Sequence, residues 1–247
     1  MNKKYSKDIF PETPESFKNT VRMTLDSLPE EEEHSMKFRF RKRGILIAAV
    51  IMVVGTTVFA AQNITSIVGN SSNIAFYEEL PTEDQIMKDF SFKPVLLESF
   101  SNGFKFDKAY KEDTEGLDDN GNSVDKAKNV IFDYKKGNEV VTLESSAKKI
   151  GTDQISNPVD SYKGTDIFYS EDMYKFVPAD YEMTEQDKKD EKSGKYIFSY
   201  GTSEVEIQKF KHISWEKGGV YYSLYGMDLS ISEDDMIQMV HEAIDAK

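Results

Sequence analysis

The hydrophobic pattern is dominated by the uncharged stretch from Gly44 to Ala61. As an α-helix rising ~1.5 Å per residue, this stretch would span ~27 Å, close to the hydrocarbon thickness of a bilayer. β-branched residues recur through it and it has no polar face, which argues against the alternative of a buried core helix in a globular domain. The pattern therefore predicts a single transmembrane helix over 44–61.

The residues that flank this stretch predict its orientation. Polar, uncharged residues such as Gln62 and Asn63 follow it. A basic cluster precedes it and is the expected membrane anchor: Lys37, Arg39, Arg41, Lys42 and Arg43. The positive-inside rule then places residues 1–43 in the cytoplasm and the rest of the chain outside the cell membrane. The alternative is a signal peptide cleaved after Val58-Phe59-Ala60, but about forty residues before the apolar core is longer than the usual leader.

The cytoplasmic tail contains one amphipathic element. Thr13 and Pro14 are a typical helix start, and Pro29 ends the pattern. Between them, apolar residues recur at helical spacing and form the candidate partner-binding stripe: Phe17, Val21, Leu25 and Leu28. So short a helix is marginal alone in water, so the stripe is expected to bind a partner. A solvated tail with incidental helicity is the alternative.

Beyond the span, residues 62–80 are expected to form a stalk and residues 81–247 one extracytoplasmic domain. A helix is predicted over 81–90, with Thr82 as N-cap and Gln85 at the third helical position. A closing helix is predicted to begin after Ser232. Strand patterns dominate between the two helices. They cover 94–100, 104–110, 129–134, 139–145, 164–170, 173–177, 195–200, 205–215 and 220–225.

The segments between these strands are expected to be irregular. An acidic loop is predicted over 111–128, and an exposed loop or a short polar helix over 184–194. Antiparallel strands with a helix at each end predict an α+β domain, in which helices cover a curved antiparallel sheet.

Charge and composition narrow the function classes. Residues 1–43 carry ten Lys and Arg against eight Asp and Glu, whereas residues 62–247 carry 21 against 36. So acidic an outer domain is repelled by nucleic acid and by anionic lipid surfaces, so no nucleic-acid partner is expected. The chain has no Cys, which excludes a disulfide framework and thiolate metal sites.

Fragments of catalytic and metal-binding motifs lack the context that their chemistry needs. Ser145-Ser146-Ala147-Lys148 fits S-x-x-K without its partner motifs. His241-Glu242 begins like a zinc-protease helix, but Asp245 occupies the position of the second His. Asp118 to Asn122 resembles a calcium loop that lacks its first and twelfth ligands, and an Asn-Gly turn fits better. We therefore expect no catalytic, metal or cofactor site and no enzyme.

Aromatic residues near the C-terminus are the remaining candidates for ligand contact. Trp215, Tyr221 and Tyr225 could line a groove for a lipid or peptide, since a curved sheet covered by helices often encloses an apolar cleft. Tyr222 has the opposite parity to Tyr221 and Tyr225, so part of this set is more simply explained as core.

The layout resembles a known family. The quoted features are Pro14-Glu15-Ser16-Phe17 leading to Pro29, a basic anchor, and one span that ends at Phe59-Ala60-Ala61. With the closing segments 214–224 and 229–236, they resemble membrane-anchored anti-sigma-factor-like proteins of Firmicutes. Their uncharacterised outer domains are similar in plan to the LolA and MucB/RseB half-barrels, which bind lipidic or peptide signals.

This resemblance implies a single-pass regulator of transcription. Its outer domain would sense an envelope signal, and its inner helix would hold a sigma factor. The alternative is a membrane-anchored lipid, peptide or cell-wall binding protein with no signalling role.

Overall fold

The computed structural model describes Ile64 and residues 66–71, 74–118, 120–150, 157–178 and 180–246. The predicted partner-binding helix, the basic anchor and the transmembrane helix at 44–61 lie outside the described residues. Within the described residues, no helix is long and apolar enough to cross a membrane.

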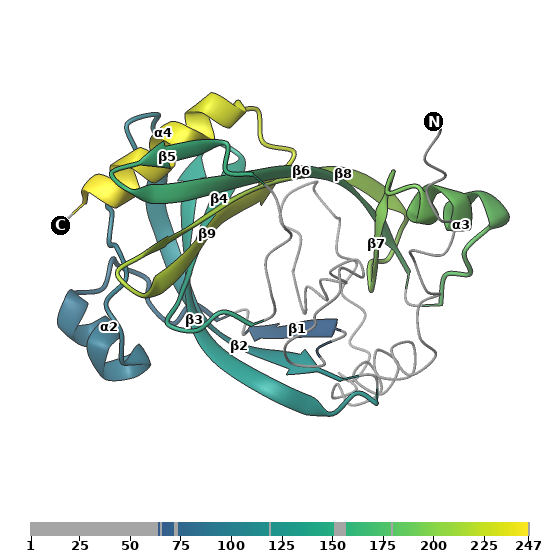
Figure 1. Cartoon of the computed structure of the whole chain (residues 1–247), viewed down its shortest axis with the longest axis horizontal. Coiled ribbons are helices and arrows are strands. Elements are labelled where there is room, and N and C mark those ends of the chain that lie inside the picture. The colour runs from purple at the N-terminus through teal and green to yellow at the C-terminus, as the bar shows by residue number, and fades with distance from the viewer. Residues whose placement is uncertain are drawn as a thin grey trace, which may run out of the picture.

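The strands of the described chain form one curved sheet (Figure 1). Its order is β1-β2-β3-β4-β9-β8-β6-β5, with antiparallel neighbours, and β7 pairs in parallel with β6. The strands are β1 (Ser66–Ser71), β2 (Lys105–Leu117), β3 (Ser123–Lys136), β4 (Glu139–Ser146), β5 (Asp160–Tyr162), β6 (Thr165–Val177), β7 (Ile197–Tyr200), β8 (Glu206–Lys217) and β9 (Val220–Met227). In Figure 1, β1 to β3 and β6 to β8 form two arms that diverge from the end of the sheet where α2 and α4 lie.

Each described helix begins with a capping box, which explains where it starts. The helices are α2 (Glu83–Phe90), α3 (Glu185–Lys192) and α4 (Glu233–Asp245). Thr82, Thr184 and Ser232 are their N-caps, and each hydroxyl accepts a hydrogen bond from the third helical N–H. The side chain of that third residue in turn accepts from the N-cap N–H, so two otherwise unpaired donors are satisfied at each helix start.

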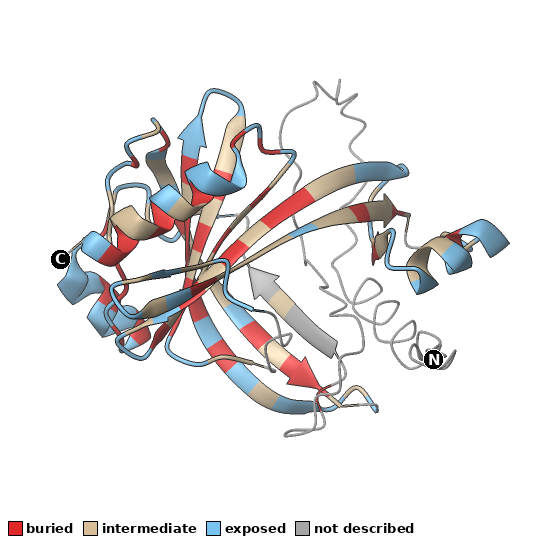
Figure 2. Cartoon of the chain, turned by 45° about the horizontal axis from the view of Figure 1, so that its top comes forward, coloured by how far each residue is buried: buried red, intermediate tan, exposed pale blue. Residues whose placement is uncertain are grey.

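The core lies between one face of the sheet and the helices α2 and α4. Phe132, Leu143, Leu224 and Ile213 are opposite one another across β3, β4, β9 and β8, and all four are buried. Met236, Met239, Val240 and Ala243 close this layer from α4, and Ile86 and Phe90 from α2. Figure 2 shows the buried positions along one side of α4 and alternating along the strands. Burying each large apolar side chain contributes about 1.5–3 kcal/mol.

The expected fold class is confirmed: the described chain is an α+β domain with a curved, mainly antiparallel sheet and covering helices. The capped starts of α2 and α4 agree with the sequence analysis, and so do the strands predicted over 129–134 and 139–145, which lie in β3 and β4. One strand was not expected. β1 lies within the segment assigned to a stalk, where it pairs with β2 through Ser66↔Leu117 to Ser71↔Glu112.

Three other expectations are corrected. The segment 111–128 is not an acidic loop, because β2 continues to Leu117 and β3 begins at Ser123, so the two strands form a long hairpin arm. The predicted break at Glu171-Asp172 is absent, because β6 pairs continuously with β8 through this region. The segment 94–100 forms no strand beyond an isolated bridge from Ser99 to Lys105.

Candidate functional site

Trp215 lies in the core and not in a groove. It is 3% exposed, on the helix-covered face of β8, directly opposite Tyr222 of β9. The two rings are stacked, with centroids 5.0 Å apart and 8° between their planes. The Tyr222 hydroxyl accepts a hydrogen bond of 3.2 Å from the Val95 N–H, which fixes the chain that follows α2 against the sheet.

Tyr221 and Tyr225 lie on the opposite face of β9, so the structure does not bring the three predicted groove residues together. Both tyrosines are half-buried. Tyr221 lies under the Lys149 ammonium, 5.9 Å from the ring centroid. The Tyr225 ring is 5.6 Å from that of Phe210. Ligand contact through these two tyrosines remains a prediction.

A group of carboxylates that the sequence did not indicate lies on this same face. Glu112 of β2, Thr114 of β2, Asn129 of β3 and Glu144 of β4 form what we call the carboxylate cluster. The Asn129 amide nitrogen donates to the Thr114 hydroxyl at 2.8 Å and to the Glu144 carboxylate at 2.5 Å. The Thr114 hydroxyl donates to the Glu112 carboxylate at 3.1 Å. Asn129 therefore connects the two carboxylates across three strands.

Both acids of the cluster are held toward their neutral form. Burial raises the pKa of Glu144 to about 8, the charge of Glu112 raises it further, and the hydrogen bond from Asn129 offsets part of the change. Burial also raises the pKa of Glu112, against hydrogen bonds from Thr114 and Asn129 that lower it. The two half-buried acids are linked through Thr114 and Asn129, so ionisation of one disfavours ionisation of the other.

His212 of β8 is a second buried titratable group on this face. Its Nε2 lies 3.2 Å from the Ser223 hydroxyl, and burial together with the charge of Lys149 lowers its pKa to about 4. A neutral imidazole beside a serine is one element of a nucleophilic site, but such a site also needs a group that orients the base. No described carboxylate is hydrogen-bonded to His212. The pair is therefore most simply a satisfied core contact.

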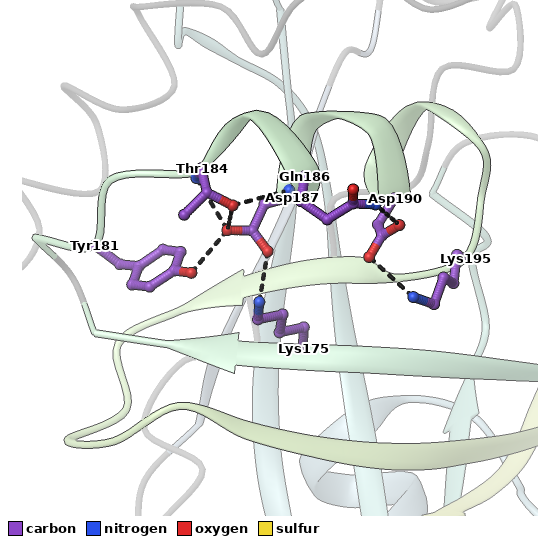
Figure 3. A network of polar contacts seen from close by, with 7 residues as sticks. All are labelled: Lys175, Tyr181, Thr184, Gln186, Asp187, Asp190 and Lys195. Carbon is purple, nitrogen blue, oxygen red and sulfur yellow. Dashed lines mark hydrogen bonds and ion pairs between the residues drawn. The ribbon is translucent and has the colours of Figure 1, made fainter.

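Asp187 organises the other arm of the sheet (Figure 3). Its carboxylate accepts hydrogen bonds from Lys175 of β6 at 2.5 Å, from the Tyr181 hydroxyl at 2.8 Å and from the Thr184 hydroxyl at 2.7 Å. The Asp187 and Lys175 side chains are only 5% and 16% exposed. Burial alone would raise the pKa of Asp187, but these three donors outweigh it and hold the pKa well below its ordinary value.

This network has a structural explanation. Asp187 is the third residue of α3, so its carboxylate also closes the capping box with Thr184. Both carboxylate oxygens of Asp187 therefore accept from donors of the same arm, Oδ1 from Lys175 and Oδ2 from Tyr181 and Thr184. The Asp187 network therefore fixes α3 on β6.

The other sequence fragments also receive structural explanations. Asp118 accepts from the Asn120 and Asn122 N–H groups at 2.9 and 2.8 Å and so closes the turn between β2 and β3. His241 of α4 is 2.6 Å from Asp160 of β5, and its ring stacks on Tyr162 at 3.9 Å. Ser145 is fully buried. Within the described residues, no group of three or more His, Cys, Asp or Glu side chains could hold a metal ion.

The carboxylate cluster is thus the strongest candidate functional site in the described chain. Asn129 is 15 residues from Thr114 and 15 from Glu144 along the sequence, and only the register of β2, β3 and β4 brings the cluster together. Comparison with protein-family models, with curated proteins and with solved structures gives no match.

Proposed function

We propose that this protein is a single-pass membrane regulator of transcription with an extracytoplasmic sensory domain. The proposal is carried by one observation in the sequence, the uncharged stretch 44–61 with a basic cluster on one side and a strongly acidic domain on the other. A short tail with a single apolar stripe then remains on the cytoplasmic side. Phe17, Val21, Leu25 and Leu28 are its contact residues, and a sigma factor is the partner that the layout suggests.

The fold of the described domain is compatible with a sensory role. Helices cover one face of the sheet, and the other face carries buried ionisable groups whose protonation can change. Buried polar groups cost stability unless they are satisfied, so a concentration of them points to a role beyond packing.

The test is a pulldown of the full chain, solubilised from membranes, with the bound proteins identified by mass spectrometry. The full chain should retain a sigma factor, and a chain without residues 2–30 should lose it. Val21→Asp places a charge in the apolar stripe and should abolish retention. Asn19→Asp adds the same charge on the opposite side of the helix and should leave retention unchanged.

If neither the full chain nor Asn19→Asp retains a sigma factor, the regulator proposal is wrong. The second candidate is then a membrane-anchored lipid or peptide carrier, which the half-buried Tyr221 and Tyr225 favour. In that case, lipid or peptide extracted with the protein should be lost on Tyr221→Ala and Tyr225→Ala, while removal of residues 2–30 should have no effect.

A further inference from the structure

β1 pairs beside β2, and its Gly69 closes on Glu112 of the carboxylate cluster. Gly69 of β1 is opposite Thr114, and a Cβ atom added to Gly69 would be 3.1 Å from the Glu112 carboxylate. The Glu112 side chain therefore occupies the space that a side chain at 69 would need. β1 is also the edge strand of the sheet, and β2 is its strand partner.

Within the described residues, the two acids of the cluster have no ion-pair partner. Neither Glu112 nor Glu144 forms an ion pair with a described Lys or Arg. Their hydrogen-bond donors are the neutral Asn129 and Thr114. A second ionised carboxylate in the cluster would be partly desolvated and repelled by the first. It would gain water if β1 separated from β2.

Other titratable groups face the cluster. Asp113 and Asp133 add negative charge, and burial raises the pKa of Asp133. Tyr225 and His212 remain neutral near pH 7, because burial raises the pKa of the tyrosine and lowers that of the histidine. The positive charge of Lys149 also lowers the pKa of His212. β1 itself adds no charge, since the sequence of residues 66–71 contains no ionisable residue.

We propose that Glu112 and Glu144 share one proton while β1 is docked on β2, and that loss of this proton releases β1 from the sheet. The outer domain would then respond to an alkaline shift outside the cell by freeing the strand that begins five residues after the predicted span. This inference rests on the proposed sensory function, under which the release of β1 is the signal. The proton-linked docking itself requires no partner.

The sign of the effect follows from linkage. Gly69 covers Glu112, burial raises the pKa of Glu112, and the charge of Glu112 raises that of Glu144, so the docked state binds more protons. Docking is therefore strongest below the ordinary pKa of Glu, and it weakens as the pH rises from there to about 8. Linkage of one proton changes the opening equilibrium by up to about tenfold per pH unit.

The test is hydrogen exchange of the full chain in lipid nanodiscs, followed by mass spectrometry of peptides that cover 66–71. After correction for the intrinsic exchange rate, opening of β1 should rise several-fold to about tenfold per unit between pH 6 and pH 8. The exchange of peptides from β6 and β8 should not show this rise with pH. Glu144→Gln, which keeps the acceptor for Asn129, should make the β1 profile flat.

Two further variants complete the experiment. Glu98→Gln makes the same chemical change at an exposed position and should retain the wild-type profile. Glu112→Gln provides a second test of the pair if Glu144→Gln folds poorly, and it should also flatten the profile. A wild-type profile that is already flat, or one unchanged in both cluster variants, would overturn the proposal. Because the readout needs no sigma factor, this result is independent of the pulldown.

Discussion

Trp215 and Tyr222 stack across β8 and β9 with 8° between their ring planes, and Tyr222 in turn accepts a hydrogen bond from the Val95 N–H. This pair ties the segment after α2 to the sheet. Trp215 is the only tryptophan of the chain, so its fluorescence reports directly on this region of the core.

Tyr222→Phe should keep the stack and lose the hydrogen bond, which leaves the Val95 N–H buried without its acceptor. We expect a loss of about 1–3 kcal/mol in the free energy of unfolding. The measurement is urea unfolding followed by Trp215 fluorescence. Tyr221→Phe, one residue away on the other face, is the control and should change stability by less than about 0.5 kcal/mol. Equal losses in both variants would contradict the assignment.

The ion pair between Asp187 and Lys175 should be worth far more than the exposed pairs of the same helix. Asp187→Asn leaves a buried ammonium uncompensated, so we expect a loss of about 3–5 kcal/mol, recovered in part by adding Lys175→Met. Glu185→Gln breaks an exposed pair on α3 and should cause a much smaller loss, because solvent screens this pair. A double-mutant cycle that gives no coupling would refute this account of the network.

The Asp187 network also makes the stability of the fold depend on pH in the acid range. The folded-state pKa of Asp187 lies below its ordinary value, so its contribution is fully present above the ordinary Asp pKa and is lost as the pH falls below it. Stability measured between pH 5 and pH 2 should fall less steeply in Asp187→Asn than in the wild type. Parallel curves would be the contrary result.

Gly226 is a position where only glycine fits. An added Cβ atom would lie 2.7 Å from the Val140 carbonyl oxygen and 2.9 Å from the Leu229 side chain. The first contact is with backbone and cannot relax cheaply, so Gly226→Ala should destabilise the domain by about 1–3 kcal/mol. Thermal or urea unfolding measures this, with Gln238→Ala on the exposed side of α4 as the control. A gain in stability would show that β4 and β9 can separate here.

His212 should remain neutral over most of the accessible pH range. Its pKa is lowered to about 4. Between about pH 4 and pH 6.5 the unfolded chain therefore binds a proton on His212 that the folded chain does not bind. Its contribution to stability is therefore present above about pH 6.5 and falls as the pH decreases toward 4. Ring NMR signals, assigned with His212→Gln, should show a midpoint near pH 4. A midpoint above pH 6 would place His212 in contact with water.

The sequence was informative where a signal is local. Thr82 with Gln85 and Ser232 with Asp235 predict helix starts because capping is decided within four residues. The alternation of Val141 and Leu143 predicts a strand because one face of β4 is buried. Strand parity indicated that Tyr222 lies on the other face from Tyr221 and Tyr225, and in the structure Tyr222 is the buried one.

The sequence did not predict structure that depends on residues far apart along the chain. The arm formed by β2 and β3 carries charges on both faces, so no apolar alternation marks it as strand. Its stability comes instead from pairing with β1 and from cross-strand contacts such as Lys126 with Glu115. Glu171 likewise resembles a turn residue in the sequence. In the structure it lies within β6 and forms an ion pair with Lys209 of β8, with 2.7 Å between the ammonium and the carboxylate. Glu112 and Glu144 carry no local signal, since register alone makes them neighbours.

The antiparallel register of β1 also fixes the order in which it would yield to mechanical load. A pull transmitted through the preceding chain reaches Ser66 first, opposite Leu117, and Ser71 last, opposite Glu112. The hydrogen bonds between β1 and β2 would therefore break in sequence along the arm, toward the base of the sheet. Tension from the N-terminal side of the described domain would therefore meet a single edge strand before it reaches the layer beneath α4.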